Sequence, residues 1–132
     1  MIEILTIKTS SRIEMINVTE RITDFITRYN MGNGICCLFV PHTTAGITIN
    51  ENADPSVQRD INSKLTSLVP AGDNYSHLEG NSDSHIKSTV VGSSLVVIID
   101  KGRPVLGTWQ GIFFCEFDGP RNRNLYIKLI EG

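Results

Sequence analysis

The sequence predicts an α+β fold: a compact single domain of mostly antiparallel β-sheets packed with two to three helices. Strand-like segments outnumber helical ones by about two to one, in the order β-β-α-β-β-α-(α)-β-β-β. The 132 residues, 40% of them hydrophobic, suit one domain, residues 1–132, with its own core. No stretch has the composition of an interdomain linker.

Residues 2–8 alternate apolar and polar side chains, which predicts a half-buried strand. Residues 12–16 predict a second strand, joined to the first as a hairpin through a turn at 9–11. Asn17 then has the character of a helix N-cap, with Glu20 as its capping-box partner. The apolar face of this helix is predicted to be Ile22, Phe25, Ile26 and Tyr29. Gly32 or Gly34 is predicted to end it.

Residues 35–40 form an apolar run of strand length that stops at a proline, and alternation resumes as a strand over 46–50. Asp54 and Pro55 then open the clearest helix, because an acidic N-cap followed by proline suits a first helical turn. The apolar stripe expected along this helix is Val57, Ile61, Leu65 and Leu68.

Residues 70–83 are rich in Gly, Asn, Asp and Ser and predict the longest loop, a common place for functional residues. A short helix is expected over 84–91, with His85 on its first turn. Further strands are expected at about 94–100, 111–118 and 124–130.

Charge and composition argue against several classes of protein. The net charge is −2, and the only dense basic run, residues 121–123, is too short to follow a nucleic-acid backbone. No apolar run approaches the roughly 18 residues of a membrane span, and the start lacks the pattern of a signal peptide. Three cysteines, two of them adjacent, indicate packing residues in a reducing cytoplasm.

All three histidines lie in polar stretches: His42 follows Pro41, and His77 and His85 flank a Glu-Gly-Asn segment. Three imidazoles that converge would supply three nitrogen ligands to a metal and leave a position open for water or substrate. They could equally transfer protons near neutral pH. The alternative is that each is an ordinary surface or hydrogen-bonding residue.

Carboxylates and amides accompany the histidines. Glu51 and Glu79 are candidate general bases, or partners that orient an imidazole; solvated surface acids are the alternative. Asn50 and Asn81 could bind substrate, although turns and caps also explain asparagine.

A third polar stretch surrounds the only tryptophan. Trp109 and Gln110 lie between glycines, which let a ring and a backbone approach a ligand closely. Arg121 follows a Gly-Pro turn and offers a planar fork for phosphate or carboxylate. A buried tryptophan beside a hairpin with solvated arginines is the alternative.

These motifs together resemble the YjbQ-like family over essentially the whole chain. The motifs are His42-Thr-Thr-Ala, Ile49-Asn-Glu-Asn-Ala-Asp-Pro, His77-Leu-Glu-Gly-Asn, Gly107-Thr-Trp-Gln and Glu116-Phe-Asp-Gly-Pro-Arg. The resemblance implies a compact α+β fold and a homotrimer. It also implies a thiamine-phosphate-synthase-like transferase, which joins hydroxymethylpyrimidine diphosphate to thiazole phosphate and releases pyrophosphate.

The resemblance assigns roles to ten positions. His42, His77 and His85 would bind a divalent metal; His77, Glu51 and Glu79 would be catalytic; Asn50, Asn81, Trp109, Gln110 and Arg121 would bind a small phosphorylated substrate. A leaving diphosphate favours Mg²⁺, whereas three imidazoles favour Zn²⁺. Two further hypotheses are a metal-dependent hydrolase or lyase and a non-catalytic binder of a phosphorylated metabolite.

Overall fold

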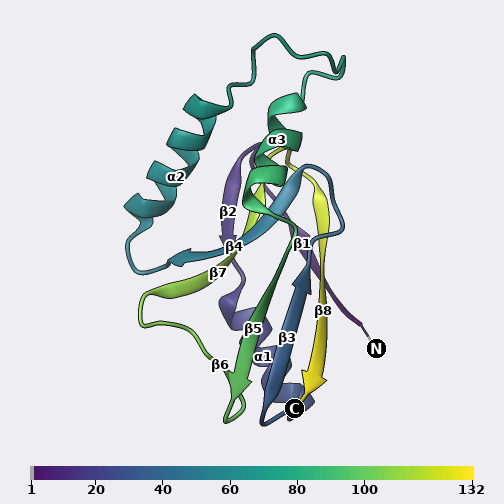
Figure 1. Cartoon of the computed structure of the whole chain (residues 1–132), viewed down its shortest axis with the longest axis vertical. Helices are drawn as coiled ribbons and strands as arrows, with labels where there is room; N and C mark the ends of the chain where they lie inside the picture. Colours follow the sequence, from purple (N-terminus) through teal and green to yellow (C-terminus); the bar gives the residue numbers. More distant parts are fainter. Residues whose placement is uncertain (1) are drawn as a thin grey trace.

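Two antiparallel β-sheets and three helices account for the secondary structure of residues 2–132, the part that the computed structural model describes (Figure 1). Sheet A has the strand order β1 (Glu3–Lys8), β8 (Asn122–Glu131), β3 (Gly34–Phe39), β5 (Ser94–Asp100) and β6 (Arg103–Pro104). Sheet B has the order β2 (Glu14–Asn17), β7 (Gln110–Glu116) and β4 (Ala45–Glu51). The helices are α1 (Thr19–Tyr29), α2 (Pro55–Leu68) and α3 (Ser82–Val91). The predicted α+β class is confirmed.

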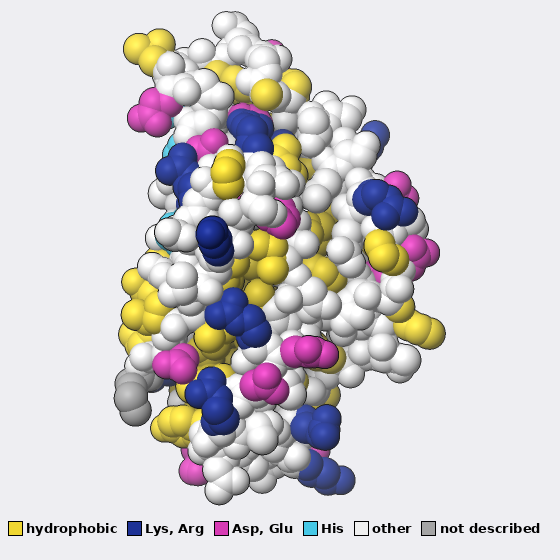
Figure 2. Space-filling view, turned by 180° about the vertical axis from the view of Figure 1, so that it is seen from behind, with side chains coloured by type: hydrophobic (Ala, Val, Ile, Leu, Met, Phe, Trp, Pro, Cys, Tyr) yellow, Lys and Arg dark blue, Asp and Glu magenta, His cyan; other side chains and the backbone are white. Residues whose placement is uncertain are grey.

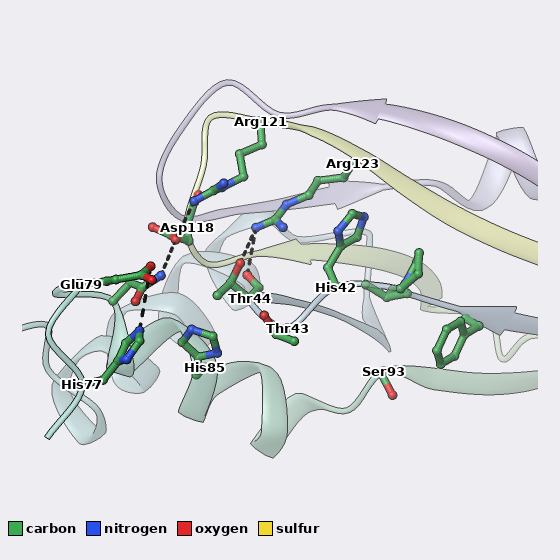
Figure 3. Close-up of a pocket in the computed structure, with 14 residues that line it drawn as sticks. His42, Thr43, Thr44, His77, Glu79, His85, Ser93, Asp118, Arg121 and Arg123 are labelled. Carbon is green, nitrogen blue, oxygen red and sulfur yellow. Dashed lines mark hydrogen bonds and ion pairs between the residues drawn. The ribbon is translucent and has the colours of Figure 1, made fainter. Parts of the chain in front are cut away.

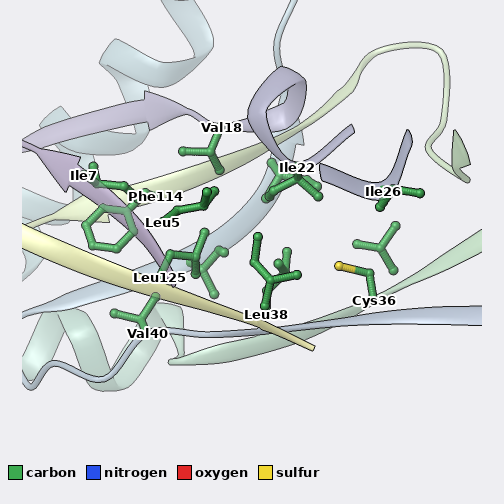
Figure 4. Packing of buried hydrophobic residues seen from close by; sticks show 14 of the residues in the cluster. Leu5, Ile7, Val18, Ile22, Ile26, Cys36, Leu38, Val40, Phe114 and Leu125 are labelled. Atoms are coloured by element: carbon green, nitrogen blue, oxygen red, sulfur yellow. The ribbon is translucent and has the colours of Figure 1, made fainter. Parts of the chain in front are cut away.

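The main core lies between sheet A and a second layer made of α1 and sheet B. Leu38 of β3 packs in one cluster with Ile22 and Ile26 of α1 and with Phe114 of β7, all fully buried (Figure 4). Burying a side chain of this size stabilises a fold by about 1.5–3 kcal/mol, before entropy is counted. The apolar run predicted as a strand at residues 35–40 and the apolar face predicted for α1 therefore meet in this core.

The central strand of sheet B is apolar on both faces. Ile112 and Phe114 of β7 face the main core, while Phe113, Cys115 and Phe117 form a second cluster on the opposite side. The apolar side chains of α2 cover that side only partly, and Leu68 stays 65% exposed. Viewed from behind, apolar side chains are visible in a hollow of this face (Figure 2).

The predicted hairpin between the first two strands is wrong. β1 pairs with β8 in sheet A, and β2 pairs with β7 in sheet B. The turn at Thr9 is held by β8 instead, since the Thr9 amide donates to the carbonyl of Arg121 at 2.9 Å. The chain therefore crosses from one sheet to the other where a hairpin was expected.

The helix ends follow their predicted chemistry with two differences. The N-cap of α1 is Val18 and not the predicted Asn17, although Asn17 accepts a hydrogen bond from the Thr19 amide at 3.0 Å. α1 also ends at Asn30 in the left-handed conformation (φ 59°), before either predicted glycine. Asp54 caps α2 as expected, accepting from the Ser56 amide at 2.9 Å.

Three connections cross between the sheets at the same end of the molecule: β1–β2, β3–β4 and β7–β8. The helix α3 lies beside this end and packs on β4 (Figure 1). Polar loop residues from distant parts of the sequence therefore meet there. None of the helices described over residues 2–132 is long and apolar enough to cross a membrane.

Candidate functional site

An open pocket of about 710 Å³ lies where the β3–β4 and β7–β8 connections meet the start of α3 (Figure 3). We call it the histidine pocket, because all three histidines line it. Six of the residues predicted from the sequence line this pocket: His42, His77, Glu79, Asn81, His85 and Arg121.

His42 is held in one tautomer by the backbone of β8. Its Nε2 accepts a hydrogen bond from the Asn124 amide at 2.9 Å, so the proton of the neutral ring is on Nδ1. Burial lowers the pKa of His42, and the nearby charge of Arg123 lowers it further. His42 is therefore a neutral ring that can donate from Nδ1.

His77, in the loop before α3, and His85, on the first turn of α3, form a close pair. Their ring centroids are 5.5 Å apart and the rings stand nearly perpendicular. Nε2 of His77 lies 3.9 Å from Oε2 of Glu79, and both side chains are largely exposed (Figure 3). An imidazole beside a carboxylate can take up a proton that the carboxylate then stabilises.

Arg121 reaches the pocket from the β7–β8 turn. Its Nε donates to the Asp118 carbonyl at 2.7 Å and its Nη2 donates to Oδ2 of Asp118 at 2.9 Å. Asn81 also donates to Oδ2 of Asp118, at 2.9 Å. The carboxylate of Asp118 thus fixes an arginine and an amide from opposite walls of the pocket.

A buried ion pair lies beneath the histidine pocket and joins the three crossing connections. Arg123 donates to both carboxylate oxygens of Glu116 and to Oγ1 of Thr44 at 2.8 Å, and Thr9 donates to Glu116 at 2.8 Å. Burial by itself would raise the pKa of Glu116, but hydrogen bonds from Arg123, the Asp118 amide and Thr9, together with the charge of Arg123, outweigh it and keep the pKa lowered. This cluster holds the backbone that carries His42 and Arg121.

A second buried ion cluster positions α3. Arg12 donates to both oxygens of Asp83, at 3.1 and 3.2 Å, and Lys87 lies 3.7 Å from the same carboxylate. Ser84 donates to the Phe117 carbonyl at 2.5 Å. These contacts fix the first turn of the helix that carries His85.

Four predicted site residues lie elsewhere. Asn50 and Glu51 end β4, and Trp109 and Gln110 precede or begin β7 opposite them. We call this the Trp109 end. β4 runs from Ala45, beside the histidine pocket, to Glu51, so at about 3.3 Å per residue the two ends are roughly 20 Å apart. The structure therefore does not bring these four residues to the histidine pocket within one chain.

Side chains at the Trp109 end serve the local backbone. Asn50 accepts from the Glu51 amide at 2.7 Å, Glu51 accepts from the Ala53 amide at 3.1 Å, and Gln110 accepts from the Gly107 amide at 2.8 Å. Trp109 is 64% exposed, so the alternative of a buried tryptophan is wrong.

The predicted three-histidine metal site is not assembled in residues 2–132, where no group of three or more His, Cys, Asp or Glu side chains is placed to hold an ion. Nε2 of His42 is already bonded to a backbone amide. His77 and His85 are neighbours, with ring centroids 5.5 Å apart, but they are not part of such a group. Within the described residues the three histidines therefore share a pocket without forming a metal-binding group.

The sequence interpretation missed several pocket residues. Thr43, Thr44, Ser93, Asp118 and Arg123 also line the histidine pocket. A signal for Arg123 was available: it is in phase with the buried Leu125 and Ile127, so the alternation of β8 points it inward.

The comparisons with known proteins agree with one another. The family model described as UPF0047 protein YjbQ-like matches residues 3–132. The UPF0047 protein MJ1081 of Methanocaldococcus jannaschii is 57% identical over 94% of this chain and 90% of its own length. The UPF0047 protein YugU of Bacillus subtilis is 48% identical over 98% of this chain and 99% of its own.

Solved structures share the fold. A YjbQ/UPF0047 family protein from Clostridium acetobutylicum superposes with a TM-score of 0.95 at 47% identity, covering 97% of this chain and 99% of that one. A YbjQ-like protein of unknown function from Sulfolobus solfataricus gives a TM-score of 0.95 at 28% identity, covering 100% of this chain and 97% of that one.

These comparisons correct the expected activity. The relatives are named only as UPF0047 proteins, and one of the solved structures is described as having unknown function. The expectation of a thiamine-phosphate synthase, joining a pyrimidine diphosphate to a thiazole phosphate, is therefore wrong as a statement of what this family is known to do.

Proposed function

The chain belongs to the UPF0047 YjbQ-like family, and we propose that it is an enzyme that binds a small phosphorylated substrate in the histidine pocket. The observation that carries this proposal is the meeting of three histidines, a glutamate and an arginine in one open cavity of about 710 Å³. Such a set offers hydrogen-bond donors to an anion and groups that exchange protons.

Arg121 and His42 are the donors for the phosphate. Nη1 of Arg121 makes no hydrogen bond with the described residues, and the guanidinium is half-exposed on the pocket wall. His42 offers Nδ1–H, because Asn124 occupies its other nitrogen. A guanidinium fork and a fixed N–H can hold two oxygens of one phosphate.

Net charge contributes little to this binding. Arg121 is paired with Asp118, Arg123 is paired with Glu116, and Glu79 adds a negative charge. An anion would therefore be held by short, directed hydrogen bonds, with only a weak dependence on ionic strength.

His77 is the proposed acid–base group. When its ring takes a proton from a bound substrate, the imidazolium would face the carboxylate of Glu79, whose oxygen lies 3.9 Å from Nε2. His85, in contact with the same ring, would restrict its orientation.

Incubation of the protein with a panel of small phosphate esters, followed by mass spectrometry, tests the enzymatic part. Wild type should consume at least one ester, and His77→Gln should bind that ester but turn it over at least about 100-fold more slowly. A matched control is His85→Gln, which should lose less activity. Equal turnover by wild type and His77→Gln would contradict the assignment.

We also propose that the chain forms a homotrimer through the outer face of sheet A. Apolar side chains are exposed across that face: Ile4, Phe39, Val96, Ile98 and Ile130 are 46–60% exposed. Phe39 also lines the histidine pocket, so contacts between copies would border the site. Light scattering should report three copies for wild type and for Ser67→Asp on α2, and a smaller species for Ile98→Asp; a monomeric wild type would refute this.

A bound divalent metal, Zn²⁺ or Mg²⁺, stays a prediction, with His42, His77 and His85 as the ligands predicted from the sequence. It is an alternative to the acid–base role of His77, because a metal-bound imidazole does not take up the substrate proton. Nitrogen ligands favour Zn²⁺ of the two. Metal analysis of untagged protein should find an ion that His85→Ala loses. A cytoplasmic location is likewise proposed, supported by three free cysteines.

A further inference from the structure

A smaller, apolar cavity adjoins the histidine pocket on the far side of the His77–His85 pair. Its volume is about 340 Å³, and it is lined by Tyr75, Ser76, His77, Ser82, His85 and Ile86. We call it the Tyr75 cavity. Because His77 and His85 line both cavities, a ligand that contacts these two rings from the histidine pocket lies at the border of the Tyr75 cavity.

The lining of the Tyr75 cavity contains three side chains with rings, one alkyl side chain and two serines. The hydroxyl of Tyr75 donates to the Pro70 carbonyl at 2.6 Å, so its polar end is occupied and the ring is held in place. Ile86 of α3 is 38% exposed there. The free energy falls when a flat apolar group covers apolar surface that is open to water.

A different cavity, of about 460 Å³, also shares His85 but is lined mainly by hydroxyl groups. Two of these hydroxyls already donate within the protein: Ser88 to the Ala45 carbonyl at 2.7 Å and Thr89 to the His85 carbonyl at 2.9 Å. Each of these two hydroxyls has its proton engaged and can only accept hydrogen bonds from a ligand, which limits the recognition of a polyhydroxylated group such as a sugar.

We propose that the substrate is a phosphate ester of an aromatic group, with its phosphate in the histidine pocket and its ring in the Tyr75 cavity. This inference rests on the proposed function and specifies its substrate class. Ile86 and Tyr75 are then the residues that determine specificity, and Arg121 and His42 hold the part common to all phosphate esters.

Calorimetric titration with methyl phosphate and phenyl phosphate tests this, because both are monoester dianions and differ in the apolar group. Phenyl phosphate should bind about tenfold tighter, the gain expected from burying roughly 55 Å² of apolar surface. Ile86→Ser should abolish the preference without weakening methyl phosphate, and Ile86→Leu should retain it. Val90→Ser, on the same helix but outside both cavities, is the matched control and should also retain it.

The outcomes separate the two proposals. Equal affinities for the two esters would overturn the aromatic assignment and leave phosphate binding intact. Tighter binding of glucose 1-phosphate than of phenyl phosphate would overturn it in favour of the hydroxyl-lined cavity. If neither methyl nor phenyl phosphate binds, the proposed phosphate site itself fails, and the aromatic assignment falls with it.

Discussion

The two ends of the β4–β7 pair contain similar residue types but are built differently. At the histidine pocket, side chains from the β3–β4 and β7–β8 connections, from the loop before α3 and from α3 line a common cavity over a buried ion pair. At the Trp109 end, polar side chains bond to backbone amides one to three residues away. Residue type alone does not make a site: what matters is whether groups distant in the sequence converge with atoms left free for a ligand.

Of the changes that distinguish the two ends, loss of the buried ion pair beneath the histidine pocket should lower the free energy of unfolding most. Arg123→Met leaves the carboxylate of Glu116 buried without its partner, which costs about 3–5 kcal/mol of unfolding free energy. Arg59→Met, on the exposed surface of α2, should change it by less than about 0.5 kcal/mol. Urea unfolding measures both, and equal effects would show that the cluster does not hold the fold together.

Removing the proposed phosphate ligand comes next in size. Arg121→Ala should weaken methyl phosphate binding about tenfold, because one charge-assisted hydrogen-bonding group is lost. Arg103→Ala, in β6, should leave the affinity unchanged. Calorimetry with both variants distinguishes a local contact from a general loss of positive charge.

A smaller effect is expected in the pH dependence of stability. The pKa of His42 in the folded protein is lowered from 6.5, so in the range just below that value the unfolded chain binds more protons than the folded one. The contribution of His42 to the free energy of unfolding is therefore fully present above about pH 6.5, and it is lost as the pH falls toward the lowered pKa. His42→Gln can still accept from the Asn124 amide but carries no titrating proton.

Urea unfolding at pH 7.5 and 5.5 measures this difference. The variant should lose less stability than wild type between the two values. Glu116 and Asp83 do not interfere, since their pKa values are lowered from 4.5 and 3.8 and their contributions disappear only at more acidic pH. An identical decline in both proteins would show that His42 does not titrate as described.

The smallest effect belongs to the Trp109 end. Trp109→Ala should cost less than about 1 kcal/mol, because the ring is 64% exposed and little apolar surface is lost from the interior. Phe114→Ala, in the core and on β7, the strand that follows Trp109, should cost about 3–5 kcal/mol. A large loss for Trp109→Ala would indicate a packing role for the ring.

Local chemistry made much of the fold predictable. Asp54 and Pro55 predict the start of α2, and the apolar run at residues 35–40 predicts β3, because these signals depend on a few neighbouring residues. The hairpin failed because strand pairing is decided far away: Thr9 bonds to Arg121, 112 residues along the chain. Local alternation cannot distinguish a hairpin from a crossing between sheets.

The site was predictable in part for the same reason. Polar loop residues such as His77 and Asn81 can be found from composition, and they do line the pocket. Asn50 and Glu51 follow His42 closely in sequence, but an extended strand carries them about 20 Å away. Proximity in sequence is a poor guide to proximity in space once a strand intervenes.

The most direct test of the central claim is an amide NMR titration of the whole protein with methyl phosphate. We predict saturable shifts at residues 42–45, 77–85 and 118–124, the three segments that surround the histidine pocket. Shifts confined to residues 50–53 and 107–111, or no shifts at all, would contradict the assignment of the histidine pocket as the binding site.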